Sequence, residues 1–481
     1  MTAELVIAAN RGPIERRTDS AGRIVTHRGA GGLIAVLGPA AAAARGVWVA
    51  SALTPADVET AQATGGLDTI DLPEGPVGVR TLCHDPDAYR DYYGVVSTEL
   101  LWFLHHHLFD LRSEPSFDAR LHAAWRHFRE INDSFATACA EHAAPGGTVL
   151  IQDYHLSLAP RRLRTLRPDV RSAHFTMTPW AAPDHFATLP EGLARELLSG
   201  MLGADMVSFL VPRWADAFLE CCARAGLDVD RSRGAVRDED GHESAVRCFP
   251  VGVDGEELTA RASTGAVAAH RDRLAARVGD AALVLRVDRM DPAKNVLRGL
   301  AAYAELLERE PSRRGRVVHF VHAYSSRGDL PAYRRYADQV RALVADINDR
   351  LGNDTWQPVI LETGNDFDLA IAAMSLADVL VVNPLRDGMN LVAKEAAVVS
   401  TRGVALVLSR FAGAADDLAD GCVLVDPFDV SALAAELSAA LGLPGAEREA
   451  RLATLRKGAT ALPPREWLVA VRREMDLVTA R

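Results

Sequence analysis

The sequence predicts an α/β protein with two doubly wound parallel sheets, and three observations support this fold class. Short runs rich in Val, Leu and Ile alternate with longer stretches whose apolar residues recur at helical spacing. This alternation is typical of parallel sheets with helical crossovers. A chain of 481 residues is also too long for one ordinary hydrophobic core. Finally, residues 249–258, FPVGVDGEEL, read as a linker between two sets of such elements.

The predicted elements follow in chain order. The first set has strands at residues 5–10, 46–51, 147–153, 171–177, 205–210 and 247–253, with its clearest helix at residues 116–143. The second set has strands at residues 282–288, 316–324, 357–362, 378–383, 403–409 and 422–427. A final amphipathic helix, residues 465–481, is expected to pack back on the first domain. We therefore predict Rossmann-like domains of residues 1–253 and 254–464 that face each other across a cleft.

Composition narrows the function classes. The net charge of −11 argues against a nucleic acid or an anionic membrane as partner, since both need clustered cations. No run of 18 apolar residues predicts a membrane-spanning helix, and the N-terminus resembles a first strand rather than a signal peptide. The six cysteines lack CxxC spacing and are expected to be buried, reduced thiols. These features predict a cytoplasmic protein, and they leave open whether it forms a homo-oligomer.

Loops that follow strands are the places to search for chemistry, because ligands bind beyond the carboxyl ends of parallel strands. After residues 282–288, Arg289 and Lys294 form a pair of cations suited to a diphosphate. Only three of the 53 basic residues are lysines, which favours a specific role for Lys294 over a solvated loop. The loop after residues 5–10 carries Arg11, and Gly29, Gly31 and Gly32 precede an apolar helix, but there a simple turn is the favoured interpretation.

The loop after residues 378–383 is the most informative. Gly388 permits a tight turn and Asn390 is a good helix cap, so the first N–H groups of the next helix could face a phosphate or a sugar hydroxyl. Asp387 lies at the tip of the loop. Glu395, one turn into the helix, is placed to accept both hydroxyls of a ribose. A capped helix with an acidic first turn would explain Glu395 but not Asp387 together with Arg386.

Other candidate motifs have simpler explanations. Asp238, Glu239 and Asp240 resemble a metal-binding DxD motif, but the following glycine is typical of a hairpin turn. Three consecutive histidines, residues 105–107, point about 100° apart on a helix and cannot share one ion. The chain has no GxSxG, HExxH or GxxxxGK[ST] motif. We therefore expect neither a metal nor a cofactor.

Several motifs together resemble the trehalose-6-phosphate synthases, a family of retaining glycosyltransferases with the two-domain GT-B fold. The motifs are NRGP with GAGGL, YYGVVSTELLW, DYHL, RVDRMDPAKN, SSRGDLPAY, PLRDGMNLVAKEA and LSRFAGAADDL, in that order along nearly the whole chain. The variants NRGP and DPAKN are closer to actinobacterial members than to enteric ones. The resemblance implies that a nucleotide-sugar meets glucose 6-phosphate in a cleft between the domains.

The resemblance also implies a role for each matching residue. Arg11, Tyr93, Trp102 and Arg327 would hold the acceptor and its phosphate, and Asp153 would contact the acceptor near the reaction centre. Arg289 and Lys294 would neutralise the diphosphate, with the Gly32 amide nearby. Asp387 and the backbone of Gly388, Met389 and Asn390 would bind the transferred sugar, the Leu391 amide the diphosphate, and Glu395 the ribose. Arg289, Lys294, Asp387 and Asp153 are thus the predicted catalytic residues.

Two residues depart from the family pattern. Gln152 replaces a histidine before DYHL. Met177 stands where a histidine normally hydrogen-bonds the transferred sugar, and a thioether cannot donate such a bond. Met177 is compatible with slow glucosyl transfer, with a changed sugar donor, or with an introduced substitution.

Three functions therefore stay open. The leading prediction is transfer of glucose from GDP- or UDP-glucose to glucose 6-phosphate, which gives trehalose 6-phosphate. The second is a pseudo-glycosyltransferase that couples a nucleotide-linked cyclitol to an amino-cyclitol phosphate in natural-product biosynthesis. The third is a non-catalytic sensor of sugar phosphate. The base of the nucleotide depends on residues 362–367, which do not reveal it.

Overall fold

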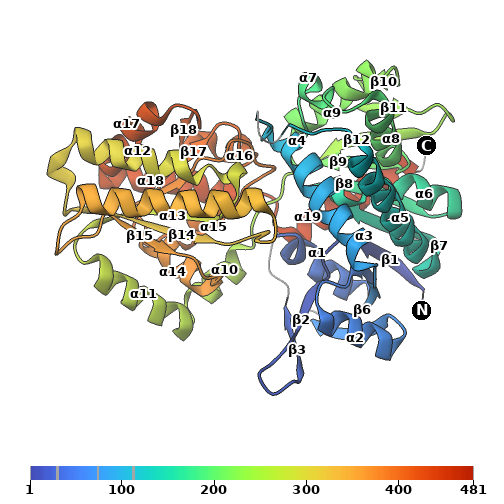
Figure 1. Ribbon diagram of the computed structural model, residues 1–481, viewed down its shortest axis with the longest axis horizontal. Helices are drawn as coiled ribbons and strands as arrows, with labels where there is room; N and C mark the ends of the chain where they lie inside the picture. Colours follow the sequence, from blue (N-terminus) through green and yellow to red (C-terminus); the bar gives the residue numbers. More distant parts are fainter. Residues whose placement is uncertain (1, 29–31, 73–74, 111–113, 480–481) are drawn as a thin grey trace. The chain divides into compact units, whose positions relative to one another are not determined.

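A ten-stranded sheet forms the centre of the first of two units in the computed structural model (Figure 1). The structure describes residues 2–28, 32–72, 75–110 and 114–479. Unit 1 comprises Met1–Pro250 with Pro464–Arg481, and unit 2 comprises Val251–Pro463.

The sheet of unit 1 has the strand order β10-β11-β12-β9-β8-β7-β1-β4-β6-β5. Its strands are β1 (Ala3–Ala8), β4 (Val47–Ser51), β5 (Leu67–Leu72), β6 (Gly75–Leu82), β7 (Ala143–Gln152), β8 (Arg171–Thr176), β9 (Met206–Phe209), β10 (Asp228–Asp230), β11 (Ala235–Arg237) and β12 (Glu243–Cys248). The strands from β12 to β6 run parallel, whereas the pairs β5–β6, β11–β12 and β10–β11 are antiparallel. A separate hairpin joins β2 (Ile14–Thr18) to β3 (Ile24–Arg28).

Helices cover the sheet of unit 1. They are α1 (Gly32–Ala43), α2 (Pro55–Thr64), α3 (Pro86–Arg90), the π-helix η1 (Asp91–Trp102), α4 (Phe103–His106), α5 (Ala119–His142), η2 (Tyr154–Leu156), α6 (Ala159–Leu166), α7 (Pro183–Phe186), α8 (Glu191–Met201), α9 (Pro212–Arg224) and α19 (Pro464–Thr479). The helix α19, red in Figure 1, lies among the N-terminal elements, where the Trp467 indole donates to the Phe249 carbonyl at 3.0 Å. Within the described residues, no helix is long and apolar enough to span a membrane.

The sequence-based prediction of unit 1 was wrong in several places. The predicted strand 247–253 ends at Cys248, since Pro250 has no N–H group to donate to a ladder. The parallel strand β6, the hairpin of β2 and β3, and the antiparallel strands β5, β10 and β11 were missed. In β5 most side chains are half-buried or exposed, so the segment lacks the continuous apolar run of a central parallel strand.

Unit 2 has a fully parallel six-stranded sheet with the order β15-β14-β13-β16-β17-β18. Its strands are β13 (Ala282–Arg289), β14 (Val317–Tyr324), β15 (Val359–Glu362), β16 (Val379–Val382), β17 (Ala405–Ser409) and β18 (Val423–Val425). These strands confirm the second predicted set.

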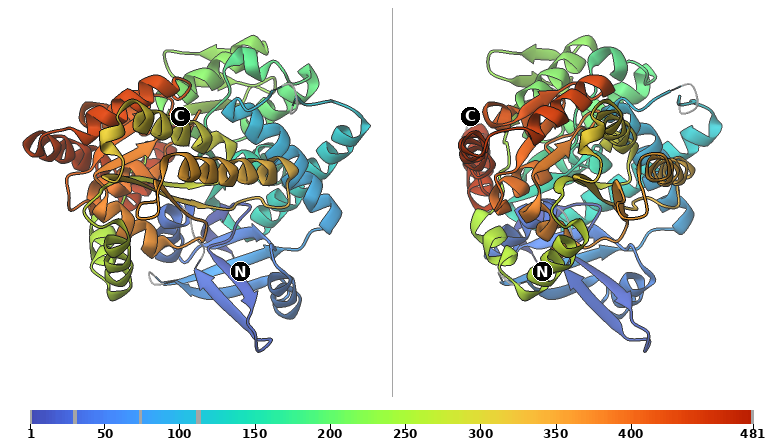
Figure 2. Two further views of the ribbon diagram at one scale, coloured as in Figure 1. Left: turned by 60° about the vertical axis from the view of Figure 1, so that its left-hand side comes forward. Right: turned by 90° about the vertical axis from the view of Figure 1, so that its left-hand side faces the viewer.

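Helices cover both faces of this sheet (Figure 2). One layer contains α12 (Val296–Arg309), α13 (Pro331–Leu351) and α17 (Val430–Leu441), and the other contains α10 (Gly255–Ala262), α11 (Gly265–Val278), α14 (Phe367–Leu376), α15 (Leu391–Val399) and α18 (Gly445–Ala459). Short helices are η3 (Pro292–Lys294), η4 (Pro311–Arg313), α16 (Ala415–Leu418) and η5 (Ala419–Gly421). Apolar side chains of α12, α13 and α17 pack with the strands into one core.

Candidate functional site

The loops after β13 and β16 lie side by side in unit 2. The two strands are hydrogen-bonded neighbours, although the chain runs out to β14 and β15 between them. In a doubly wound sheet this reversal of strand order opens a crevice at the carboxyl ends, where ligands bind. The Leu385 amide donates to the Ala293 carbonyl at 2.8 Å and joins the two loops. The predicted diphosphate cations and the predicted sugar-binding loop are therefore adjacent.

Lys294 and Asp387 meet at the junction of these loops. The Lys294 ammonium donates to Asp387 Oδ2, and the side-chain amide of Asn390 donates to the same oxygen at 3.0 Å. Burial disfavours the charge of Lys294, but the carboxylates of Asp387 and Asp288 outweigh burial and raise the pKa of Lys294. The lysine is thus held as a cation within the crevice.

A second loop fixes the backbone around Asp387. The Gly413 amide donates to the Asp387 carbonyl at 3.1 Å, and the Ala414 amide donates to the Met389 carbonyl at 2.7 Å. A Cβ atom on Gly413 would lie 1.9 Å from the Gly388 carbonyl oxygen, so only glycine permits this approach. The loop after β17 therefore holds residues 387–389 in one shape.

Helix α15 begins at the crevice. Asn390 adopts a left-handed backbone conformation, with φ at 79°, and its side chain accepts from the Ala393 amide at 3.2 Å. The amides of Leu391 and Val392, in the first turn, have no partner within the helix itself and favour an anion. Glu395 follows one turn later, and burial raises its pKa to about 7.

Lys394 has a different role from its neighbour Glu395. Its side chain is only 1% exposed and binds the Asp417 carboxylate and the Val251 carbonyl, the latter at 2.8 Å. This lysine anchors α15 within unit 2 rather than facing a ligand.

Buried charged side chains hold the loop that carries Lys294. Arg286 in β13 is fully buried, and it donates to the Asp288 carboxylate at 2.8 Å and to the Lys294 carbonyl at 3.1 Å. It also binds the Asn383 side chain. Burial raises the pKa of Asp288 to about 6, although Arg286 and Lys294 oppose that shift. The contacts of Arg286 therefore link β13 to Asn383, the residue directly after β16.

Arg289 and Arg327 approach one carboxylate. The Arg327 guanidinium lies 3.3 Å from Asp291 Oδ2, and that of Arg289 lies 3.9 Å from the same oxygen. Arg327 follows β14, which pairs with β13, and this pairing brings it beside Arg289. Unit 2 therefore holds three of the predicted substrate cations: Arg289, Lys294 and Arg327.

Unit 1 has a similar reversal of strand order between β1 and β7, which are paired. Arg11 follows β1 and is exposed, and its carbonyl accepts from the Trp48 indole at 3.1 Å. Asp153 follows β7 at the same edge of the sheet. Gly32 begins α1, whereas Gly29 and Gly31 lie outside the described residues.

Asp153 and Met177 are in direct contact. Asp153 has φ at 67°, a conformation that is uncommon for residues other than glycine, and its amide donates to the Phe175 carbonyl at 2.7 Å. Its Oδ1 accepts from the Met177 amide at 3.3 Å. Met177, whose side chain is half-buried, thus stands next to the residue predicted to lie near the reaction centre.

Helix η1 carries the predicted aromatic contacts. The ring of Tyr93 stacks between Tyr89, at a centroid distance of 5.9 Å, and His155, at 5.8 Å. His155 Nδ1 lies 3.9 Å from Asp153 Oδ2, which brings Tyr93 close to Asp153. Trp102 is 7% exposed and stacks on His106 at 3.7 Å, so little of it is open to a ligand. π-Helical turns frequently occur at functional sites.

The rejected metal motifs have structural partners. Asp238 pairs with Arg161 at 2.7 Å in the turn between β11 and β12, as the hairpin prediction requires. His105 and His107 accept from the amides of Ala181 and Ala182. Within the described part of the chain, no group of His, Cys, Asp or Glu is arranged to hold a metal ion.

All six cysteines are free. Cys83 is exposed and Cys248 is only half-buried, so the prediction that the cysteines are buried is wrong at these two positions. Cys83 follows the last residue of β6, where the chain leaves the sheet.

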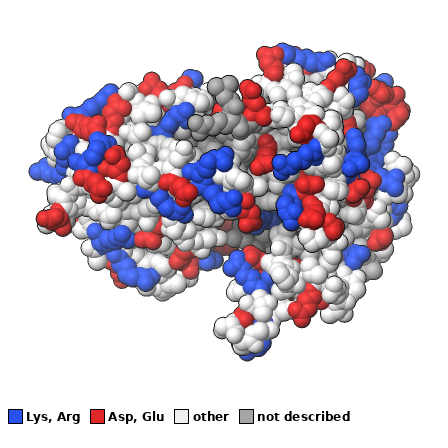
Figure 3. Space-filling view, viewed as in Figure 1, with Lys and Arg blue, Asp and Glu red and all other residues white. Residues whose placement is uncertain are grey.

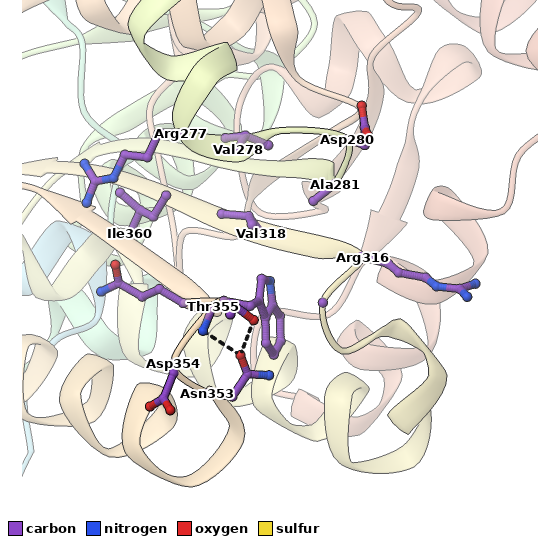
Figure 4. Close-up of a pocket in the computed structure, with 13 residues that line it drawn as sticks. Arg277, Val278, Asp280, Ala281, Arg316, Val318, Asn353, Asp354, Thr355 and Ile360 are labelled. Atoms are coloured by element: carbon purple, nitrogen blue, oxygen red, sulfur yellow. Dashed lines mark hydrogen bonds between the residues drawn. The ribbon is translucent and has the colours of Figure 1, made fainter.

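A separate depression of about 580 Å³ lies at the opposite, amino edge of the sheet in unit 2 (Figure 4). Trp356, Val318 and Ile360 line it together with the exposed Arg277 and Arg316. None of the predicted site residues lines this depression.

Acidic and basic side chains are interspersed on the face shown in Figure 3, unlike the one-sign surface of a nucleic-acid-binding protein.

Four residues around these groups were missed in the sequence: Arg286, Asp291, Gly413 and His155. A charge within the apolar run ALVLRVD was a visible sign for Arg286. Asp291 and His155 stand inside quoted motifs, but only pairings between distant segments show what they contact. No local signal distinguishes Gly413 from a glycine in an ordinary turn.

Comparisons with known proteins identify the family of this chain. The model of glycosyltransferase family 20 matches residues 3–476. The trehalose-6-phosphate synthases of Mycobacterium sp. (strain JLS) and Mycolicibacterium smegmatis are each 33% identical, over 97% of this chain and 94% and 91% of theirs.

Solved structures show the same fold. A trehalose-6-phosphate synthase family structure from E. coli, bound with UDP-2-fluoro glucose, has a TM-score of 0.84 at 25% identity and 98% coverage of both chains. The Burkholderia xenovorans alpha,alpha-trehalose-phosphate synthase in complex with glucose-6-phosphate has a TM-score of 0.84 at 26% identity, covering 98% of this chain and 99% of its own. The predicted α/β fold of GT-B type is therefore confirmed. The chain belongs to glycosyltransferase family 20, the trehalose-6-phosphate synthase family.

Proposed function

We propose that this protein is a retaining glycosyltransferase that moves glucose from a nucleotide-glucose to glucose 6-phosphate, producing trehalose 6-phosphate. The observation that carries the proposal is the group formed by Lys294, Asp387 and Asn390 at the start of α15. It combines a fixed cation, a carboxylate and a helix N-terminus, which suit a sugar linked to a diphosphate. The relatives bound with UDP-2-fluoro glucose and with glucose-6-phosphate support both substrate classes.

The main chemical task is to stabilise the leaving nucleoside diphosphate. Arg289, Lys294 and the Leu391 amide supply positive charge where the diphosphate gains negative charge. Asp387 and the backbone of residues 388–390 hold the sugar hydroxyls, and Glu395 accepts from the ribose. The Gly32 amide is assigned to the diphosphate side as well.

The acceptor is assigned to Arg11, Tyr93, Trp102, Arg327 and Asp153. The bond between the sugar C1 and the phosphate oxygen breaks, and C1 forms a bond to the acceptor hydroxyl oxygen on the same face. The hydroxyl proton passes to the leaving phosphate oxygen. This route requires no pair of glycosidase-type carboxylates.

Met177 favours a second candidate, a pseudo-glycosyltransferase that uses a nucleotide-linked cyclitol. Its amide is bonded to Asp153, so the side chain lies beside the proposed reaction centre but offers no hydrogen bond to a sugar hydroxyl. A cyclitol that lacks this hydroxyl contact would lose nothing there.

One assay separates these functions. The protein is incubated with glucose 6-phosphate and UDP-, GDP- or ADP-glucose, and release of nucleoside diphosphate and formation of disaccharide phosphate are measured. Turnover with any sugar donor supports the first function. Tight binding of nucleoside diphosphate without turnover supports the pseudo-glycosyltransferase. Binding of glucose 6-phosphate without any nucleotide binding would leave a sugar-phosphate sensor and contradict both.

A further inference from the structure

Asp291 contacts both predicted sets of substrate cations in unit 2. Its side chain is fully buried, and each carboxylate oxygen has a distinct set of partners. Oδ1 accepts from the Ala293 amide at 3.0 Å and caps η3, the short helix that ends at Lys294. Oδ2 faces the guanidinium groups of Arg327 and Arg289. One carboxylate therefore connects the diphosphate cations to the cation assigned to the acceptor phosphate.

Tyr333 completes this connection. Its hydroxyl lies 3.3 Å from Asp291 Oδ2 and accepts from Arg327 at 2.6 Å, and the side chain is buried at the start of α13. Arg327 itself has φ at 52°, a left-handed conformation that is uncommon for this residue type. Its side chain is only 7% exposed. The position of Arg327 is thus fixed from the backbone, from Tyr333 and from Asp291.

The charge of Asp291 offsets the repulsion between Arg289 and Arg327. Two guanidinium groups that converge on neighbouring phosphates repel each other, and a buried carboxylate between them removes that repulsion. One negative charge against two positive charges leaves a net positive charge for the substrates. A cap for η3 alone would need only Oδ1, whereas Oδ2 is used for the cations.

We propose that Asp291 is a positioning residue that couples the two substrate sites, by setting the distance between the diphosphate cations and the acceptor-phosphate cation. The assignment rests on the proposed function for the identity of the substrates. It acts through Arg289 and Arg327 and does not itself touch the reacting atoms.

Asp291→Asn tests this role in the full-length protein. Asparagine keeps an oxygen for the Ala293 amide but replaces Oδ2 with an NH₂ group that cannot accept from a guanidinium. We expect KM to rise about tenfold or more for both the nucleotide-sugar and glucose 6-phosphate, since small displacements of positioning groups are costly. Thermal stability is measured in parallel to confirm that the variant is folded.

Asp426→Asn is the matched control. Asp426 also accepts a backbone amide two residues ahead through Oδ1, from Phe428 at 3.0 Å, and pairs with Arg410 through Oδ2 at 2.6 Å. The Asp426→Asn variant therefore loses the same kind of ion pair as Asp291→Asn, but outside the assigned site. If the KM values of Asp291→Asn are unchanged, or rise no more than those of Asp426→Asn, the coupling role is wrong.

Tyr333→Phe provides a milder test if Asp291→Asn does not fold. It removes one hydroxyl that contacts Arg327, so KM should rise more for glucose 6-phosphate than for the nucleotide-sugar. Tyr303→Phe, which removes a buried hydroxyl bonded to the Val317 carbonyl at 3.0 Å, is its control. Unchanged KM values, or changes matched by Tyr303→Phe, would contradict the coupling.

Failure of the proposed function is a separate outcome. If the unmodified protein shows no turnover, calorimetric binding of glucose 6-phosphate and of UDP, GDP and ADP replaces KM. Weaker binding of both ligand classes by Asp291→Asn would then support the coupling without the transfer reaction. Unchanged binding, or no binding by the unmodified protein, would overturn it.

Discussion

At the scale of single residues, the start of α15, to which we assign the transferred sugar, depends on the charges of Lys294 and Asp387. Lys294, Asp387 and Asn390 share hydrogen bonds around one carboxylate oxygen. Asp153 and Met177 form the corresponding contact in unit 1. Because each group has a defined partner, single substitutions have separable effects.

Met177→His is expected to raise glucosyl transfer about tenfold, because one hydrogen bond to a substrate hydroxyl is worth about 1 kcal/mol or more. The amide of residue 177 can still donate to Asp153, since the substitution changes only the side chain. The measurement is kcat/KM with the preferred nucleotide-glucose. Met177→Leu is the control for shape. A rate no higher than that of Met177→Leu would show that the missing histidine does not limit transfer.

Glu395 predicts a pH dependence of nucleotide binding. Burial raises its pKa to about 7, and only the ionised carboxylate accepts from both ribose hydroxyls. Affinity for the nucleoside diphosphate should therefore increase about tenfold between pH 6 and pH 8 as the carboxylate loses its proton. Glu395→Gln should abolish this part of the increase and leave only the titration of the phosphate. An identical pH profile in the variant would contradict the assignment.

The same pKa affects stability. The folded protein keeps a proton on Glu395 that the unfolded chain loses above a pKa of about 4.5, so this residue lowers stability as the pH rises from 4.5 to about 7. Glu395→Gln should accordingly raise the melting temperature more at pH 8 than at pH 5. A similar change at both values would mean that the residue is not buried as a neutral acid.

At the scale of elements, the loops after β16 and β17 behave as one unit. The Asp387 amide donates to the Phe411 carbonyl at 3.2 Å, and two further backbone bonds return from residues 413 and 414. Lys394 pairs with the Asp417 carboxylate and so anchors α15. The shape of the proposed sugar-binding loop therefore depends on residues to which no substrate contact is assigned.

Gly413→Ala tests this dependence. A Cβ atom would lie 1.9 Å from the Gly388 carbonyl oxygen and 3.0 Å from Met389 Cα, so the loop must move. We expect the KM for the nucleotide-sugar to rise about tenfold or more and stability to fall by about 1–3 kcal/mol. Enzyme kinetics and denaturant unfolding measure the two effects. Gly445→Ala, where nothing lies within 4 Å, is the control, and equal behaviour of the two variants would refute the steric argument.

At the scale of the whole molecule, the chain ends in the unit where it begins. Trp467 is 1% exposed, donates to the Phe249 carbonyl and packs edge-to-face on Phe175 at 4.8 Å. Glu474 adds an ion pair with Arg247 at 2.6 Å. The last helix is therefore part of the core of unit 1.

Trp467→Ala should destabilise unit 1 selectively, by about 3–5 kcal/mol. Hydrogen exchange should become faster in β8 and β12 but stay unchanged in β13 and β16, because each unit has its own core. Val469→Ala, at a position 65% exposed on the same helix, should have little effect. Equal acceleration in both units would indicate that they unfold together.

Much of the fold was predictable because it depends on local patterns. The apolar strands of unit 2 and the long helix α5 follow directly from short-range periodicity. The antiparallel strands β5, β10 and β11 were not predictable in this way. Most side chains of β5 and β10 are half-buried or exposed, and β11 has only three residues, so none of them gives a continuous apolar signal. The end of one strand was predicted at residue 253 instead of Cys248, because Pro250 interrupts the hydrogen bonds of the sheet.

The sequence by itself determined which chemical groups follow which strands: Arg289 and Lys294 after one, Asp387 and the α15 cap after another. Only the tertiary structure decided which of these loops meet. Strand order places β13 beside both β14 and β16, and so brings Arg327, Lys294 and Asp387 to one edge. Asp291 and Gly413 gain their roles from those same pairings. The physical reason is that periodicity reports burial along one segment, whereas contacts between segments depend on how all of them pack together.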